Sequence, residues 1–306
     1  MGKRNSHRRN HGNNKDKLVQ FMDRLSDRTA IQPEERLRLE TGADAVTGRI
    51  IDLVTPIGKG QRVLLPSPPK AGKTTILQEI SRALDELSPE VHQMALLIDE
   101  RVEEVTDFER NVPAHVHASS IDQPPEKHVT TAEGTFKQAL NMVFQGKDVL
   151  ILLDSLTRLA RTYNKTVDSR GRTLSGGLSA NALDRPRMLF GAARNIEGDG
   201  SLTVIASALI DTGSRMDEVI FQEFKGTGNC ELVLDRSIAD RRIWPAVDIQ
   251  ASGTRQERKL MNDIELKAVD HLRRKLAELD KREAIKYLRK MVEQTESNDA
   301  LLRRIM

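Results

Sequence analysis

A short run of residues near position 70 has the composition of a loop that holds nucleotide phosphates. The run reads PPKAGKT at 68–74, and Gly72, Lys73 and Thr74 match the end of the Walker A pattern. In that pattern backbone N–H groups surround the phosphates, the lysine reaches the β and γ groups, and the hydroxyl ligates Mg²⁺. Ser67 stands where the pattern has its first glycine. The sequence therefore predicts binding of ATP and Mg²⁺ by Pro69, Lys70, Ala71, Gly72, Lys73, Thr74 and Thr75.

Acidic residues follow two apolar stretches further along the chain. Residues 150–153 lead to Asp154, the Walker B arrangement, in which the carboxylate holds Mg²⁺ together with Thr74. Residues 94–98 lead to Asp99 and Glu100, where a carboxylate can align and deprotonate a water. We assign this role to Glu100, with Asp99 as its competitor. Taken alone, each acid is also what an ordinary turn after a strand contains.

Arginines and the single tryptophan form a third candidate group. Arg242 and Arg255 have no evident carboxylate partner in the sequence, and Trp244 lies two residues after Arg242. In a ring of subunits such an arginine can enter the neighbour's site and stabilise phosphoryl transfer, and a Trp ring can stack on adenine. A Trp flanked by solvated arginines gives the same pattern, so spacing alone leaves both interpretations open.

Two segments combine glycine, hydroxyl and arginine side chains, at 168–177 and 211–215. Such groups suit contacts with the phosphates and 2′-hydroxyls of RNA. Aromatic residues make up 3% of the chain, which argues against an extensive base-stacking platform. Binding here is therefore predicted to depend on the RNA backbone and to weaken with salt. Ordinary surface loops have the same composition.

The elements that must position these residues alternate along the chain. Apolar stretches alternate with helical patterns, and the acids fall at the carboxyl ends of strands, where α/β sheets bind ligands. The pattern predicts an α/β fold with a mostly parallel sheet flanked by helices and a C-terminal helical segment. The expected strands are 62–65, 94–98, 148–153, 201–209 and 229–234.

Composition limits the class of protein. The 306 residues are 38% hydrophobic, with 48 Lys and Arg against 45 Asp and Glu. Residues 1–17 hold six of the basic residues and one acid, so we expect a flexible tail that can touch nucleic acid electrostatically. There is no long apolar run and one cysteine, Cys230, which predicts a cytoplasmic protein with no membrane partner.

Several ordered motifs together resemble the Rho family of bacterial transcription termination factors. They are PPKAGKT at 68–74, LIDER at 97–101, ILLDSLTRLAR at 151–161, ALIDTGS at 208–214, FKGTGN at 224–229 and SGTR at 252–255. The resemblance covers roughly residues 30–306. Many long matches in order are more specific than a single Walker motif.

The resemblance implies a RecA-like P-loop NTPase that forms a homohexameric ring, moves along single-stranded RNA and releases transcripts. It implies Lys73, Glu100, Arg255 and Arg242 as catalytic residues, with the two arginines acting across a subunit interface, and Trp244 against adenine. RNA polymerase and a full-length terminator are further candidate partners. The RNA-binding residues that it implies are Arg172, Thr173, Gly176, Thr212, Gly213, Ser214 and Arg215.

The domain organisation expected from the resemblance has two parts. Residues 1–29 form a basic tail with a short helix, and residues 30–306 form the motor domain, including C-terminal helices at 257–306. About 29 residues are too few for the N-terminal helical subdomain and OB-type domain of the family, which capture RNA. The expectation is that primary RNA loading depends on the tail or on a partner.

Two other functions are compatible with these residues. A shortened regulatory homologue could join rings of a full-length terminator and modulate them. A RecA-fold motor could also act on another substrate, as in a DNA-directed motor or the catalytic subunit of a rotary ATP synthase.

Overall fold

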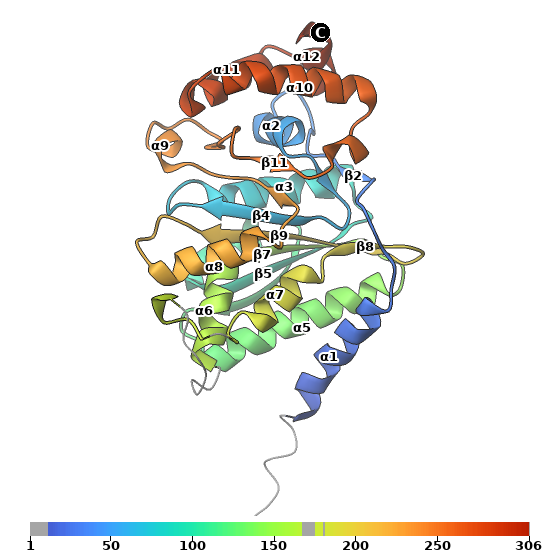
Figure 1. The fold of residues 1–306 in the computed structure, drawn as a ribbon, viewed down its shortest axis with the longest axis vertical. Coiled ribbons are helices and arrows are strands. Elements are labelled where there is room, and N and C mark those ends of the chain that lie inside the picture. The colour runs from blue at the N-terminus through green and yellow to red at the C-terminus, as the bar shows by residue number, and fades with distance from the viewer. Residues whose placement is uncertain (1–11, 167–174, 180, 306) are drawn as a thin grey trace, which may run out of the picture.

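The computed structural model describes residues 12–166, 175–179 and 181–305, without the side chains of residues 12–17. A sheet crosses its centre in the order β11-β10-β4-β9-β7-β5-β6 (Figure 1). The strands from β10 to β6 run parallel, while β11, β8 and β1 pair antiparallel. The bounds of the strands in this sheet are β1 (Ala30–Ile31), β4 (Arg62–Ser67), β5 (His92–Glu100), β6 (His115–Ser120), β7 (Val149–Asp154), β8 (Arg194–Ile196), β9 (Ser201–Leu209), β10 (Cys230–Glu231) and β11 (Gly253–Thr254). A separate pair consists of β2 (Arg36–Leu37) and β3 (Ile57–Gly58).

Helices cover both faces of the sheet (Figure 1). Because successive side chains of a strand point to opposite faces, each central strand contributes to two cores. On β7, Leu150 and Leu152 belong to one core and Ile151 and Leu153 to the other. The helices over the first core are α2 (Val46–Val54), α3 (Lys73–Leu87), α4 (Val102–Asn111), α9 (Arg236–Ala239), α10 (Asp263–Ala277), α11 (Lys281–Glu293) and α12 (Asn298–Ile305). Those over the second are α1 (Gly12–Ser26), α5 (Pro125–Val143), α6 (Leu156–Thr166), α7 (Asp184–Gly191) and α8 (Arg215–Lys225). The 3₁₀ turns are η1 (Ser175–Gly177) and η2 (Glu257–Lys259).

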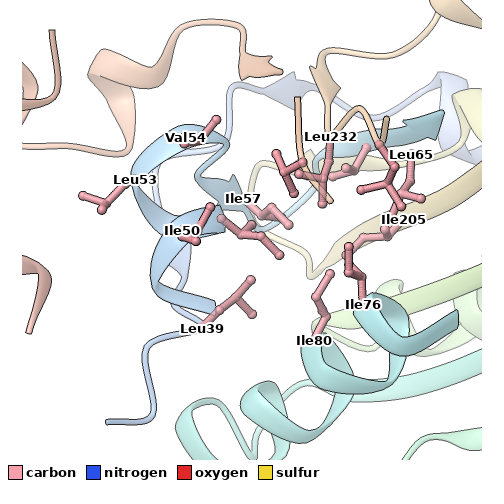
Figure 2. Packing of buried hydrophobic residues seen from close by; sticks show 14 of the residues in the cluster. Leu39, Ile50, Leu53, Val54, Ile57, Leu65, Ile76, Ile80, Ile205 and Leu232 are labelled. Carbon is pink, nitrogen blue, oxygen red and sulfur yellow. The ribbon is translucent and has the colours of Figure 1, made fainter. Parts of the chain in front are cut away.

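The first core joins α2 and α3 to the sheet. Figure 2 shows Ile50 and Ile57 meeting Leu65 and Ile205 of the sheet, with Ile76 at the start of α3 beside them. All five side chains are at most 3% exposed. This packing fixes α3, and with it the loop that precedes it, against β4.

Arg49 on α2 ties the C-terminal helices to the domain. Its side chain is fully buried, and its guanidinium donates to the backbone oxygens of Val292 (2.8 Å) and Thr295 (2.7 Å). It also donates to the Asn298 side chain at 3.3 Å and lies 3.4 Å from a carboxylate oxygen of Glu40. The end of α11 and the start of α12 are therefore held by one buried cation.

The strands that were predicted from long apolar runs are present as β4, β5, β7 and β9. In the predicted strand at 229–234, the assigned element β10 covers two residues, but Leu232 and Leu234 also donate backbone hydrogen bonds to β4. Sequence reasoning missed β6 at the sheet edge.

Helix α1 shows that residues before position 30 also pack on the domain. Leu18 and Leu25 are buried in the second core, and the Phe21 ring stacks on Phe144 with 6.2 Å between centroids. Residues 1–11 of the predicted tail lie outside the described residues. Among the described helices, none has both the length and the apolar composition to cross a bilayer.

Candidate active site

The phosphate-binding loop connects β4 to α3. Gly72, the residue before α3, has φ of 89°, a conformation that side-chain-bearing residues rarely adopt. A Cβ placed on Gly72 would lie 2.8 Å from the Trp244 ring, so the loop and the ring are in contact. Ser67, the departure from the Walker pattern, is buried and donates its hydroxyl hydrogen bond to the Pro68 carbonyl at 3.0 Å. Its side chain therefore stays out of the loop's open side.

The remaining predicted loop residues divide by exposure. Pro69, Lys70 and Thr75 are exposed, whereas Ala71 is buried in the first core. A contact that sequence reasoning missed holds the loop from outside, because Arg236 on α9 donates to the Pro69 carbonyl.

Three predicted residues converge at the carboxyl ends of neighbouring strands. The ammonium group of Lys73 lies 2.5 Å from Oδ1 of Asp154, at the end of β7, and 3.4 Å from Oε1 of Glu100, at the end of β5. Ser207 on the intervening strand β9 donates its hydroxyl to the same Asp154 oxygen at 2.8 Å. Both carboxylates are 3% exposed. The sheet order thus brings together residues separated by up to 81 positions in sequence.

The charges in this cluster change each other's protonation. Burial, followed by the negative charge of Asp154, raises the pKa of Glu100 to about 7, although Lys73 and Arg158 act to lower it. Burial acts to lower the pKa of Lys73, but the two carboxylates outweigh it and raise that pKa above its ordinary value. Oε2 of Glu100 is buried without a hydrogen-bond partner. Glu100 is therefore a carboxylate poised near neutrality with one free acceptor atom.

Arg158 on α6 is a member of the cluster that sequence reasoning missed. Its guanidinium lies 3.1 Å from Oε1 of Glu100 and donates to the backbone oxygen of Asp99 at 2.6 Å. Asp99 has φ of 57°, an uncommon conformation for a residue other than glycine. Asp99 therefore faces Arg158 and not Lys73, which separates it from its competitor Glu100. The signal available in the sequence was only an arginine one turn into the helix after Asp154.

Arg255 and Arg242 do not reach the cluster in their own chain. The backbone N–H of Arg255 bonds to Asn229, whose own N–H bonds to Arg62 at the start of β4. The phosphate-binding loop follows the other end of β4, so about 20 Å of extended strand separates the two. Arg242 lies in the loop between α9 and Trp244. Both arginines are exposed and, within the described residues, neither side chain has an ion pair or hydrogen bond.

The two predicted RNA-binding segments meet in space. A Cβ on Gly176, in η1, would lie 2.8 Å from the backbone nitrogen of Met216, so η1 packs directly on the start of α8. Ser214 caps α8 by accepting from the Asp217 N–H, and the Thr212 hydroxyl donates to the Asp217 carboxylate at 2.6 Å. Gly213 and Arg215 are exposed at this end. Arg172 and Thr173 lie outside the described residues.

The donor set fits a magnesium ion. Mg²⁺ prefers hard oxygen ligands and commonly takes one or two from the protein, with phosphate and water supplying the rest. Asp154 and the Thr74 hydroxyl offer such oxygens, and the partnerless Oε2 of Glu100 can accept from a water nearby. Within the described chain, no group of three His, Cys, Asp or Glu side chains is arranged to hold a metal without other ligands.

The parallel sheet, the glycine-containing loop at the start of α3 and the lysine–carboxylate cluster define a RecA-like P-loop NTPase domain. The chain belongs to the ATP synthase alpha/beta family, whose nucleotide-binding domain matches residues 48–254. Among curated proteins, it is 55% identical over 274 residues to transcription termination factor Rho of Streptomyces lividans, and 52% identical over 274 residues to that of Pseudomonas aeruginosa. These alignments cover 90% and 89% of this chain but 39% and 65% of the relatives. The chain thus spans less than two thirds of their length.

Solved structures support the fold. A prototypical ATPase from a type III secretion system superposes with a TM-score of 0.72 at 22% identity, covering 90% of this chain and 85% of that one. The assembled ATPase EscN from the type III secretion system of enteropathogenic E. coli gives the same TM-score and identity and is covered over 72% of its length.

Proposed function

We propose that the protein is a Rho-like, RNA-dependent ATPase that moves along single-stranded RNA and releases transcripts from RNA polymerase. The observation that carries the ATPase part is the convergence of Lys73, Glu100 and Asp154 at adjacent strand ends. Identity of 52% to 55% to factors named transcription termination factor Rho supports the choice of RNA as the track.

Each residue of the cluster has a role in this proposal. Lys73 exchanges its contact with Asp154 for the β and γ phosphates of ATP, and Glu100 then aligns the attacking water and accepts its proton. Ser207 keeps Asp154 oriented through a hydrogen bond that does not involve the nucleotide. Bound Mg²⁺, held by Thr74 and Asp154, would offset the negative charge of the phosphates. Trp244, in contact with Gly72, provides the face for adenine.

The ring is inferred from the two arginines. Arg255 lies at the far end of β4 from the loop, so it can serve only a nucleotide bound to a neighbouring subunit. Arg242 assists at the same interface. A homohexamer in which each subunit completes the next one's site accounts for two exposed arginines without partners among the described residues. Arginines supplied in this way contribute about 10³ to 10⁵ in rate.

RNA contact is assigned to the surface formed by η1 and the start of α8. Thr212, Gly213, Ser214 and Arg215 offer hydroxyl, backbone and guanidinium donors to phosphates and 2′-hydroxyls. Gly176, packed against Met216, belongs to the same surface, and Arg172 and Thr173 extend this assignment in sequence.

The test is ATP hydrolysis measured with and without pyrimidine-rich single-stranded RNA, with DNA of the same sequence as the comparison. We expect RNA to stimulate turnover and Lys73→Ala to abolish it while circular dichroism shows a folded protein. Lys147→Ala is the matched control, because this exposed lysine precedes β7 at the opposite edge of the sheet. A wild-type protein that binds RNA without faster hydrolysis would contradict the proposal.

A further inference from the structure

The C-terminal helices α10, α11 and α12 surround a cavity of about 380 Å³ that the proposed reaction does not use. Its lining includes the cations Lys275, Lys290 and Arg304, the Tyr287 ring, and an apolar floor with Met291 and Leu301. No acidic side chain lines it. The volume falls in the range of pockets that hold small organic ligands, about 300 to 1,000 Å³.

The three cations differ from other basic residues on the same helices. Within the described residues, Lys286 pairs with Glu283 at 2.9 Å and Arg289 pairs with Glu293 at 2.7 Å. Lys275, Lys290 and Arg304 have no such carboxylate partner there and are exposed. The positive charge at the cavity is therefore not balanced by ion pairs and remains available to an anion.

Tyr287 adds a flat apolar face to this charge. It is 44% exposed, and in the part of the chain that the structure describes only Trp244, at 43%, is a comparably exposed large aromatic side chain. Trp244 lies against the phosphate-binding loop. Aromatic faces beside cations are the combination that binds nucleotides of single strands, because bases stack on the ring while phosphates meet the cations.

We propose that this cavity is a second contact for single-stranded RNA, with one base stacked on Tyr287 and the flanking phosphates held by Lys275, Lys290 and Arg304. The proposal rests on the proposed function for the choice of RNA. Figure 1 shows α10, α11 and α12 at the end of the molecule away from α6 and α8. The cavity is thus separate from the loop surface at η1 and α8, and it captures RNA without contributing to hydrolysis.

The test measures affinity for a fluorescent pyrimidine-rich RNA by anisotropy, without ATP and across a salt series. Tyr287→Ala is expected to weaken binding about tenfold, as expected for loss of one stacked base, and Tyr287→Phe to restore it. The double variant Lys275→Ala/Lys290→Ala is expected to lower the salt dependence by up to about two phosphate contacts. Lys286→Ala, a paired cation on the same helix outside the cavity, should bind as the wild type does.

Hydrolysis at saturating RNA separates this proposal from the one on which it rests. The cavity variants should keep the wild-type maximal rate, because they change capture and not turnover. If the wild type shows no RNA stimulation while Tyr287→Ala still weakens binding, the motor proposal fails and the cavity assignment stands. Wild-type affinity and salt dependence in the cavity variants would overturn the assignment. So would weakening by the lysine changes alone, with equal competition by polyglutamate, which would indicate a surface for acidic protein.

Discussion

At the scale of single residues, the protonation of Glu100 depends on where the fold places it. Burial beside Asp154 disfavours its charge, and Lys73 and Arg158 only partly compensate, so its pKa rises to about 7 from an ordinary 4.5. Folding therefore favours the protonated carboxyl, a contribution fully present below pH 4.5 and lost as the pH rises through 7. Stability and activity consequently change in opposite directions over this range, because the base must be ionised.

This pKa predicts the pH dependence of ATP hydrolysis. The value of kcat/KM, which reports on the free enzyme, should fall as the pH drops below about 7, because at pH 6 only about one-tenth of Glu100 is ionised. Steady-state rates at saturating RNA between pH 5.5 and 8.5 provide the measurement. Glu100→Gln should lose most of the rate and show no inflection near pH 7. A flat profile for the wild type from pH 6 to 8 would count against Glu100 as the base.

At the scale of elements, α6 connects the nucleotide cluster to the surface assigned to RNA. Arg158, near its start, contacts Glu100, and Arg161, one turn later, holds both carboxylate oxygens of Asp217. Asp217 is 1% exposed and also accepts from Thr212. A shift of the loop at Thr212 is therefore felt on the same helix that positions Glu100.

Asp217→Asn is expected to reduce the ratio of RNA-stimulated to basal hydrolysis by about fivefold or more, with the basal rate retained. The amide cannot accept two hydrogen bonds from Arg161, so the loop and α6 lose their common anchor. Rates with and without RNA give the ratio. Glu218→Gln, an exposed carboxyl on the same turn, is the control and should behave like the wild type. Equal ratios for the two variants would contradict this connection.

The elements also show what could be predicted from the sequence. Strands buried on both faces, such as β7, consist almost wholly of apolar residues, so their pattern is visible locally. Strand β6 reads HVHASS and lies at the sheet edge, half buried, which leaves no such pattern. Helix α1 was judged by the charge before it, although Leu18 and Leu25 are buried. Arg158 could not be found because its partner Glu100 is 58 residues away in sequence.

At the scale of the whole molecule, the C-terminal helices depend on Arg49. Burial lowers the pKa of this guanidinium and Glu40 opposes that effect, so its charge is held by hydrogen bonds to α11 and α12. Arg49→Met should lower the free energy of unfolding by about 3 to 5 kcal/mol, because several buried acceptors lose their donor. Urea unfolding followed by circular dichroism measures this.

Arg282→Ala provides the comparison for Arg49, since Arg282 forms an exposed pair with Asp280 and should change stability by no more than about 1 kcal/mol. A loss of less than about 1 kcal/mol in Arg49→Met would mean that the helices are held mainly by apolar packing.

The separation of Arg255 from the phosphate-binding loop along β4 has a further consequence for assembly. A subunit with a donor at one end and an acceptor site at the other joins its neighbours head to tail, through a heterologous contact. Any open chain of such subunits leaves one nucleotide without an arginine and one arginine without a nucleotide. Closure into a ring removes both unmatched ends, so every site becomes equivalent and the ring acquires a fixed sense of rotation.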